Sequence, residues 1–193
     1  MRVISGKHRG RILHEFKGKD IRPTSDRAKE AIFSILQNDV NGMSFLDLFA
    51  GSGSVGIEAL SRGAGRVVFC DKEKFSCDLV KANLKLLNIE AEVLLTPALF
   101  GLNRFITRKE KFNVIFLDPP YKTKLGVDAV EIIDKNKLIT ENGMVIYEYA
   151  EGEKHNINLE NLVEFDTRRY GKAVFSFFEY KREEESEEVS EEE

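Results

Sequence analysis

The sequence predicts an α/β fold: a mostly parallel, seven-stranded sheet with helices on both faces, an antiparallel C-terminal hairpin and a small N-terminal β-hairpin extension. Short apolar runs alternate with longer amphipathic segments from Met43 to about Tyr149, which is typical of parallel strands joined by helices. Two strand-like runs near the C-terminus are separated only by Gly171-Lys172, as in a tight hairpin. At the other end, short apolar runs flank the basic segment Gly6-Lys-His-Arg-Gly10.

The elements are expected in the following order. A first helix follows the N-capping sequence Pro23-Thr24-Ser25, carries apolar residues at helical spacing and ends near Asn38. Strands are predicted at residues 45–49, 66–70, 91–95, 112–117, 144–149, 162–170 and 173–180. The helices between them are predicted at residues 54–62, 74–88, 98–107 and 126–136. We expect Phe175, Phe177 and Phe178 to pack in the core rather than to stack on bases.

Length and composition indicate one globular domain with small appendages. The chain has 193 residues, of which 42% are hydrophobic, enough for one buried core. We divide it into a basic hairpin extension at residues 1–23, the main domain at 24–180 and a tail at 181–193. The tail carries a net charge of −6 and only one apolar residue beyond residue 182, so we expect it to be disordered.

The sequence favours a cytoplasmic protein without a metal. No apolar run approaches the roughly 18 residues that cross a bilayer, and the first residues lack the apolar core of a signal peptide. Cys70 and Cys77 are the only cysteines, and no Cys/His cluster has the spacing of metal ligands.

The N-terminal segment is basic although the whole chain carries −4. The first 30 residues contain nine Lys and Arg against four Asp and Glu, and the first 180 residues sum to +2. This segregation favours a surface that contacts a polyanion. An ordinary solvated hairpin is the alternative.

The tetrad Asp118-Pro119-Pro120-Tyr121 directly follows an apolar run that ends at Leu117. Doubly wound folds bind ligands at the carboxyl ends of parallel strands, and the two prolines hold the backbone rigid there. Acceptor oxygens beside an aromatic ring suit a planar amine. A turn that only closes an αβ unit would require neither the acid nor the ring.

A glycine-rich segment, Asp47-Leu-Phe-Ala-Gly-Ser-Gly-Ser-Val-Gly56, follows the first core strand, and Asp71 lies 20 residues beyond Gly51. Such a loop brings backbone N–H groups at a helix N-terminus close to a ligand. The pattern also matches G-x-G-x-x-G, so a nicotinamide dinucleotide stays possible.

Asp47 favours a different ligand, because its charge would repel a pyrophosphate but would attract an ammonium group. An amino-acid ligand joined to a ribose and an adenine, as in S-adenosylmethionine, would use Asp47, the loop and Asp71 together. Phe49, Lys72 and Leu99 are placed to line the adenine cleft. The structural alternatives are a helix cap for Asp71 and a hydrogen-bonded strand-end carboxylate for Asp47.

These residues resemble the amino-methyltransferases that use S-adenosylmethionine, and more closely the bacterial small-subunit ribosomal RNA guanine-N2 methyltransferases of the RsmD type. The likeness covers residues 1 to about 180. It is carried by Ile4–Leu13, Arg22–Phe33, Asp47–Ala64 and the tetrad. The tetrad is shared with DNA amino-methyltransferases, whereas the two N-terminal segments point to ribosomal RNA.

The resemblance implies a Rossmann-like class I methyltransferase that methylates a guanine N2 amine in 16S ribosomal RNA and releases S-adenosylhomocysteine. It implies catalytic roles for the tetrad, and as partner a small-subunit assembly particle; we expect a monomer. Its implied cofactor residues are Asp47, Phe49, Ala50, Gly51, Ser52, Gly53, Gly56, Asp71, Lys72, Thr96, Ala98 and Leu99, and its RNA-contacting residues are Lys7, Arg9, Arg11, Arg22, Thr24 and Arg27. The chain departs from the family after the third core strand, where Thr96-Pro97-Ala98 replaces the usual acid beside adenine.

Three alternative functions stay open. An adenine-N6 methyltransferase acting on DNA or RNA would share the cofactor residues and the tetrad. A nicotinamide-dependent oxidoreductase would use Gly51, Gly53, Gly56 and Asp71. An RNA-binding protein with an inactive cofactor fold is disfavoured, because all four tetrad residues are present.

Overall fold

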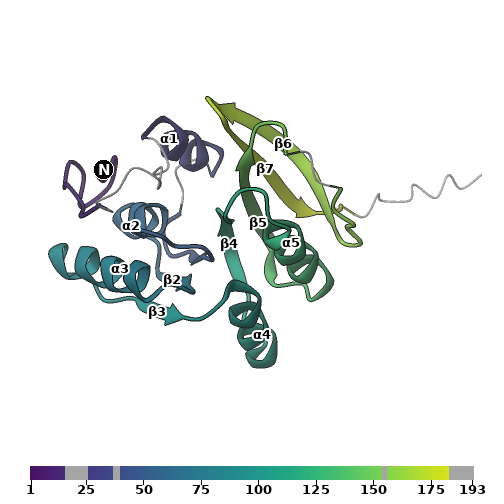
Figure 1. Ribbon diagram of the computed structural model, residues 1–193, viewed down its shortest axis with the longest axis horizontal. Coiled ribbons are helices and arrows are strands. Elements are labelled where there is room, and N and C mark those ends of the chain that lie inside the picture. The colour runs from purple at the N-terminus through teal and green to yellow at the C-terminus, as the bar shows by residue number, and fades with distance from the viewer. Residues whose placement is uncertain (16–25, 37–39, 154–155, 183–193) are drawn as a thin grey trace, which may run out of the picture.

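The computed structural model describes residues 1–15, 26–36, 40–153 and 156–182. Helices and strands alternate through most of this chain (Figure 1). Their bounds are α1 Asp26–Ile35, β1 Ser44–Asp47, α2 Ser54–Ser61, β2 Arg66–Asp71, α3 Lys74–Leu86, β3 Glu92–Leu95, α4 Ala98–Arg108, β4 Phe112–Leu117, α5 Leu125–Lys135, β5 Ile139–Ala150, β6 Leu162–Tyr170 and β7 Ala173–Tyr180.

The strands form one seven-stranded sheet in the order β3-β2-β1-β4-β5-β7-β6. The first five strands in this order are parallel. Strand β7 inserts antiparallel between β5 and β6, and the β6–β7 hairpin forms the edge seen in yellow-green in Figure 1. The predicted parallel sheet and antiparallel C-terminal hairpin are confirmed.

The central strands β1, β2 and β4 are buried on both faces of the sheet, since their consecutive residues point to opposite sides and most of them are buried. Phe45 of β1 packs in a core cluster with residues of α1, α2 and α3, whereas the next residue, Leu46, packs with α4 and α5 on the other face. Likewise, Phe175 and Phe177 lie in the first cluster and Phe178 in the second. The prediction that these three rings belong to the core is confirmed.

The predicted elements differ from the observed ones mainly at their ends. Strand β5 begins at Ile139 instead of Met144, because Ile139 already pairs with Phe112 across an irregularity in the β4–β5 register. In α1 the predicted apolar face omits Lys29, which is fully buried. The N-capping sequence before α1 and its expected end near Asn38 lie outside the described residues.

Residues 1–15, called the N-terminal hairpin below, fold back through one antiparallel bridge between Arg2 and Ile12. Val3 and Leu13 are buried in the core cluster that also contains α1 and α2 residues. Gly6 allows a close approach, since a Cβ there would lie 1.8 Å from the carbonyl oxygen of Ser61 in α2. The hairpin therefore packs tightly on the helices behind the glycine-rich segment.

None of the helices in the described parts of the chain is long and apolar enough to cross a membrane.

Candidate active site

The sheet register brings the predicted site residues to one edge. Asp47 ends β1 and pairs with Phe69 and Phe116 in the neighbouring strands, so Asp71 and Asp118 follow two residues later on each side. Asp71 pairs with Leu95 of β3, which Thr96 follows directly. Parallel strands end at the same edge of a sheet, where doubly wound folds bind ligands. Four predicted positions from four strands are thus brought together.

The turn between β1 and α2, residues 48–53, is called the glycine loop below. Gly51 and Gly53 adopt left-handed backbone conformations with φ of 53° and 76°, which side chains with a Cβ rarely tolerate. The loop is held by its neighbours, since Leu48 donates to the carbonyl of Phe116 and Ala50 to that of Cys70. The first turn of α2 follows at once, and its first backbone N–H groups have no acceptor within the helix.

The carboxylate of Asp47 is almost completely buried. It accepts one hydrogen bond from the backbone N–H of Gly56 at 3.0 Å. Burial, together with the negative charges of Asp118 and Asp71, raises its pKa to about 7, and the bond from Gly56 partly opposes this rise. A buried carboxylate with a raised pKa is a site where a cationic ligand gains electrostatic energy.

Asp71 organises the turns around the edge. One of its oxygens accepts the backbone N–H of Gly51 and the other that of Glu73, each at 2.8 Å. Glu73 is the N-cap residue of α3, so Asp71 does support the helix start, as its structural alternative supposed. Each carboxylate oxygen has a second lone pair, which leaves capacity for ribose hydroxyl groups.

The tetrad forms a fixed turn after β4. The hydroxyl of Thr123 donates to the carbonyl of Pro120 at 2.7 Å, and the N–H of Lys122 donates to Glu153 at 2.8 Å. Asp118 keeps part of its surface accessible, although surrounding protein desolvates its carboxylate and raises its pKa to about 7. The Tyr121 side chain is 45% exposed.

The residues present fit S-adenosylmethionine. Three carboxylates meet at one edge, where the charges of Asp71 and Asp118 raise the pKa of Asp47, and this suits a ligand carrying a sulfonium and an ammonium group. The glycine loop and the start of α2 provide backbone donors for the carboxylate of the same ligand. In the described residues no group of three or more His, Cys, Asp or Glu could hold a metal ion.

Thr96 follows β3 at the position where the resembled family usually has an acid. The backbone N–H of Thr96 donates to the carbonyl of Asp71 at 2.9 Å. The carbonyl of Thr96 accepts the thiol of Cys70. Pro97 has no N–H. The Thr96 hydroxyl and the first backbone N–H groups of α4, at Ala98 and Leu99, therefore remain as candidate partners for adenine.

Phe49 and Leu99 are partly buried against the core cluster on the α4–α5 face, as expected for residues lining an apolar cleft. Lys72 is exposed, with its ammonium group 3.7 Å from the Glu73 carboxylate. Among the predicted cofactor residues, Ala50, Gly53, Gly56 and Ala98 are buried, and Gly51 and Ser52 are partly exposed.

The predicted RNA-contacting residues lie at a different part of the surface. Lys7, Arg9 and Arg11 are exposed on the N-terminal hairpin. Burial and the positive charges of Lys7 and Arg11 lower the pKa of His8 between them, which indicates a positive potential there. Arg27 is exposed on α1, whereas Arg22 and Thr24 lie outside the described residues.

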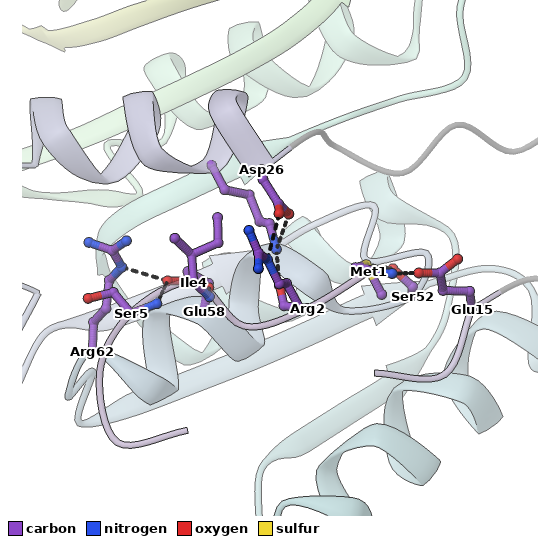
Figure 2. A network of polar contacts seen from close by, with 10 residues as sticks. Met1, Arg2, Ile4, Ser5, Glu15, Asp26, Ser52, Glu58 and Arg62 are labelled. Atoms are coloured by element: carbon purple, nitrogen blue, oxygen red, sulfur yellow. Dashed lines mark hydrogen bonds and ion pairs between the residues drawn. The ribbon is translucent and has the colours of Figure 1, made fainter. Parts of the chain in front are cut away.

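Sequence reasoning missed the buried polar residues that hold the hairpin. The carboxylate of Glu58 in α2 accepts the backbone N–H groups of Ile4 and Ser5 at 2.8 and 2.9 Å and pairs with Arg62 (Figure 2). Ser61 accepts the N–H of His8 and donates to the carbonyl of Ser5. In the sequence, the only sign of this contact was that Glu58 is the single charged residue among the mostly apolar residues of α2.

Comparisons with known proteins agree with the geometry. The family described as Conserved hypothetical protein 95 matches residues 1–179. YlbH of Bacillus subtilis is 41% identical over 77% of this chain and 82% of its own length. "Ribosomal RNA small subunit methyltransferase D" of Haemophilus influenzae is 37% identical over 83% of this chain and 84% of its own length.

Among solved structures, a hypothetical protein of Thermus thermophilus superposes with a TM-score of 0.81 at 26% identity, covering 93% of this chain and 99% of that one. The family match spans nearly the whole chain, and the Haemophilus relative exceeds 30% identity over most of it. The chain therefore belongs to the Conserved hypothetical protein 95 family, the ribosomal RNA small subunit methyltransferase D family.

Proposed function

We propose that this protein transfers a methyl group from S-adenosylmethionine to the exocyclic N2 amine of a guanine in 16S ribosomal RNA. The observation that carries this proposal is the convergence of Asp47, Asp71 and Asp118 beside the glycine loop at one edge of the sheet. The acids at β1 and β2 suit the cofactor, and the tetrad after β4 suits a planar amine. The name of the Haemophilus relative supports the ribosomal RNA substrate.

Cofactor binding is assigned to groups that the fold has already oriented. Asp47 would hold the ammonium group, Asp71 the ribose hydroxyl groups, and the Thr96 hydroxyl with the N–H groups of Ala98 and Leu99 the adenine. When bound, S-adenosylmethionine supplies an electrophilic methyl group. Lys72, whose ammonium lies beside Glu73, would contribute its aliphatic stem to the cleft.

The tetrad would prepare the amine for attack. The exocyclic nitrogen of guanine is a weak nucleophile, because its lone pair is delocalised into the ring. The Asp118 carboxylate and the carbonyl of Pro119 would accept its two N–H groups and direct the lone pair. Tyr121 would stack on the base, and Pro120, whose carbonyl is held by Thr123, would keep the turn rigid. Besides orienting the amine, Asp118 would receive its proton after transfer.

RNA binding is assigned to the exposed cations Lys7, Arg9, Arg11 and Arg27, together with Arg22 and Thr24. These groups would hold the phosphate backbone while the target guanine enters the tetrad, at a cost of a few kcal/mol for unstacking. A solved structure of a Thermus thermophilus 16S rRNA N2 G1207 methyltransferase superposes on this chain with a TM-score of 0.67. Because its identity is 19%, that likeness supports the fold alone. We infer a monomer that acts in the cytoplasm on a small-subunit assembly particle.

An Asp118→Ala variant tests the assignment of the tetrad. We expect it to abolish transfer of a tritiated methyl group to ribosomal RNA while its affinity for S-adenosylhomocysteine stays within about threefold of wild type, since Asp118 orients the amine. Asp128→Ala, which removes an acid of the same type from the first turn of α5, is the matched control and should keep activity. Near-normal turnover of the Asp118 variant would refute the assignment.

Two further measurements separate the alternatives. A thermal-shift screen should show stabilisation by S-adenosylhomocysteine and none by nicotinamide dinucleotides, as expected for a ligand that binds only the folded state. Nucleoside mass spectrometry of ribosomal RNA from cells lacking the protein should show the loss of one N2-methylguanosine. Loss of N6-methyladenosine instead would show that the substrate base is adenine and not guanine.

A further inference from the structure

Asn83 is a fully buried amide in the last turn of α3, and none of the proposed catalytic or binding roles uses it. Its side chain contacts two segments far away in the sequence. The oxygen accepts the backbone N–H of His14 at 2.7 Å, and the amide nitrogen donates to the carbonyl of His14 at 3.2 Å. The same nitrogen donates to the carbonyl of Ser52 in the glycine loop at 3.1 Å.

These three bonds use both donors of the amide and one lone pair of its oxygen. The opposite orientation of the amide would place its NH₂ group against the N–H of His14, so the contacts themselves fix the orientation. Loss of one partner of such a buried side chain lowers the free energy of unfolding, because a polar group is then left without a hydrogen bond. Asn83 thus joins the N-terminal hairpin and the glycine loop through one rigid group.

The bond to Ser52 fixes a peptide plane that faces the cofactor edge. The carbonyl of Ser52 and the N–H of Gly53 belong to one planar unit and point in opposite directions. Asn83 holds the carbonyl, and the carbonyl of Ala50 accepts the N–H of Gly53 at 2.7 Å. Because both ends of this unit are held, the left-handed turn at Gly53 is determined partly by Asn83.

The bonds to His14 fix the hairpin that carries the basic residues. Arg11 accepts the N–H of Val3, and Leu13 donates to Met1, so the two arms move as one unit. A second contact reaches the loop at the same place, where the hydroxyl of Ser52 lies 3.4 Å from the sulfur of Met1 (Figure 2). The hairpin that presents Lys7, Arg9 and Arg11 is therefore connected to the glycine loop by backbone-directed bonds.

We propose that Asn83 is a positioning residue that links RNA contact by the N-terminal hairpin to cofactor binding by the glycine loop. This inference rests on the proposed function. RNA that restrains the hairpin also restrains Asn83 and the Ser52–Gly53 peptide, so the loop loses less conformational freedom when the cofactor binds. Linkage is reciprocal, so bound cofactor should tighten RNA binding by the same factor.

The test measures the affinity for S-adenosylhomocysteine with and without a 16S ribosomal RNA transcript. We expect the transcript to tighten binding to the wild type about fivefold or more, and this factor to fall to about one in Asn83→Ala. Ser61→Ala is the matched control: it removes two buried bonds to the hairpin from the far end of α2 and should keep the wild-type factor. An unchanged factor in Asn83→Ala, or a factor of one in the wild type, would overturn the linkage.

A second measurement uses only the wild type, in case Asn83→Ala does not fold. Hydrogen exchange followed by mass spectrometry should show that S-adenosylhomocysteine slows exchange at residues 13–14, which lie outside the cofactor edge. Unchanged exchange at these residues despite bound S-adenosylhomocysteine would reject the linkage alone. If S-adenosylhomocysteine does not bind at all, the proposed function itself fails.

Discussion

The charge of Asp118 raises the pKa of the buried carboxylate of Asp47, although the two residues are 71 positions apart in the sequence and end different strands. Burial is the largest cause for Asp47 and the main cause for Asp118, and the pKa of each is raised to about 7. The folded protein without cofactor therefore holds ionised acids at an energetic cost. A cationic ligand removes part of that cost, so this edge of the sheet is arranged for binding at the expense of stability.

Replacing Asp47 by Asn should stabilise the protein at neutral pH while weakening cofactor binding. Between pH of about 4 and about 7 the folded state holds a proton on Asp47 that the unfolded state has lost, so stability falls as pH rises through this window. Asn cannot ionise, and its side-chain oxygen can still accept the N–H of Gly56. We expect a gain of about 1–3 kcal/mol in unfolding free energy above pH of about 7, measured by urea denaturation.

The same variant should show no gain below pH of about 4, where Asp47 is protonated in both states. Its affinity for S-adenosylmethionine should fall about tenfold or more, since a charge-assisted bond to the ammonium is lost. A gain of equal size at every pH would mean that the stabilisation does not come from ionisation.

Methyl transfer should depend on pH through Asp118. Only the ionised carboxylate of Asp118 can both accept an N–H of the amine and later take its proton, and burial raises its pKa to about 7, so the rate should rise about tenfold per pH unit below that value and level off above it. The measurement is single-turnover transfer with saturating cofactor. Asp118→Asn, which cannot titrate, should give a low rate without this dependence; a flat wild-type profile would contradict the role of Asp118.

Gly56 is required by packing, because a Cβ at this position would lie 2.4 Å from the ring of Phe69 in β2. Gly56→Ala should therefore destabilise the protein by about 1–3 kcal/mol, measured by urea denaturation. Phe69→Leu should provide room for the added methyl group, so Gly56→Ala should lower the unfolding free energy less in the Phe69→Leu background than in the wild type. An equal loss of unfolding free energy in both backgrounds would show that the contact with Phe69 is not the cause.

Changing Arg9 and Arg11 to Ala should weaken RNA binding and flatten its dependence on salt. Each lost phosphate contact lowers the slope of log affinity against log salt by about one, so the double variant should lose about two. Lys111 and Lys135 are exposed cations that lie directly before β4 and in the last turn of α5, outside the N-terminal hairpin. Their double alanine variant removes the same charge and should leave the slope unchanged.

Much of the fold was predictable because its signals are local. Strand β4 and the β6–β7 hairpin were predicted with the observed bounds, since apolar runs and a two-residue turn specify them over a few residues. Strand β5 was predicted to begin five residues too late, at Met144 instead of Ile139. Its first part is defined by pairing with Phe112, a contact that no local pattern contains.

The candidate site likewise contains residues that the sequence predicted and contacts that it did not. The sequence by itself identified Asp47, the glycine loop, Asp71 and the tetrad, because each follows an apolar strand and strand ends of a parallel sheet meet at one edge. It also indicated the family. It did not show that Asp71 holds the loop through Gly51, nor that Glu58, Ser61 and Asn83 anchor the N-terminal hairpin.

Those contacts join residues 20 to 69 positions apart, and only the tertiary structure decided them. A buried polar side chain looks like an ordinary surface residue in the sequence until the fold removes its water and supplies a backbone partner. The chemistry of the site was therefore determined by residue type and strand order, whereas its connection to the basic hairpin was determined by packing.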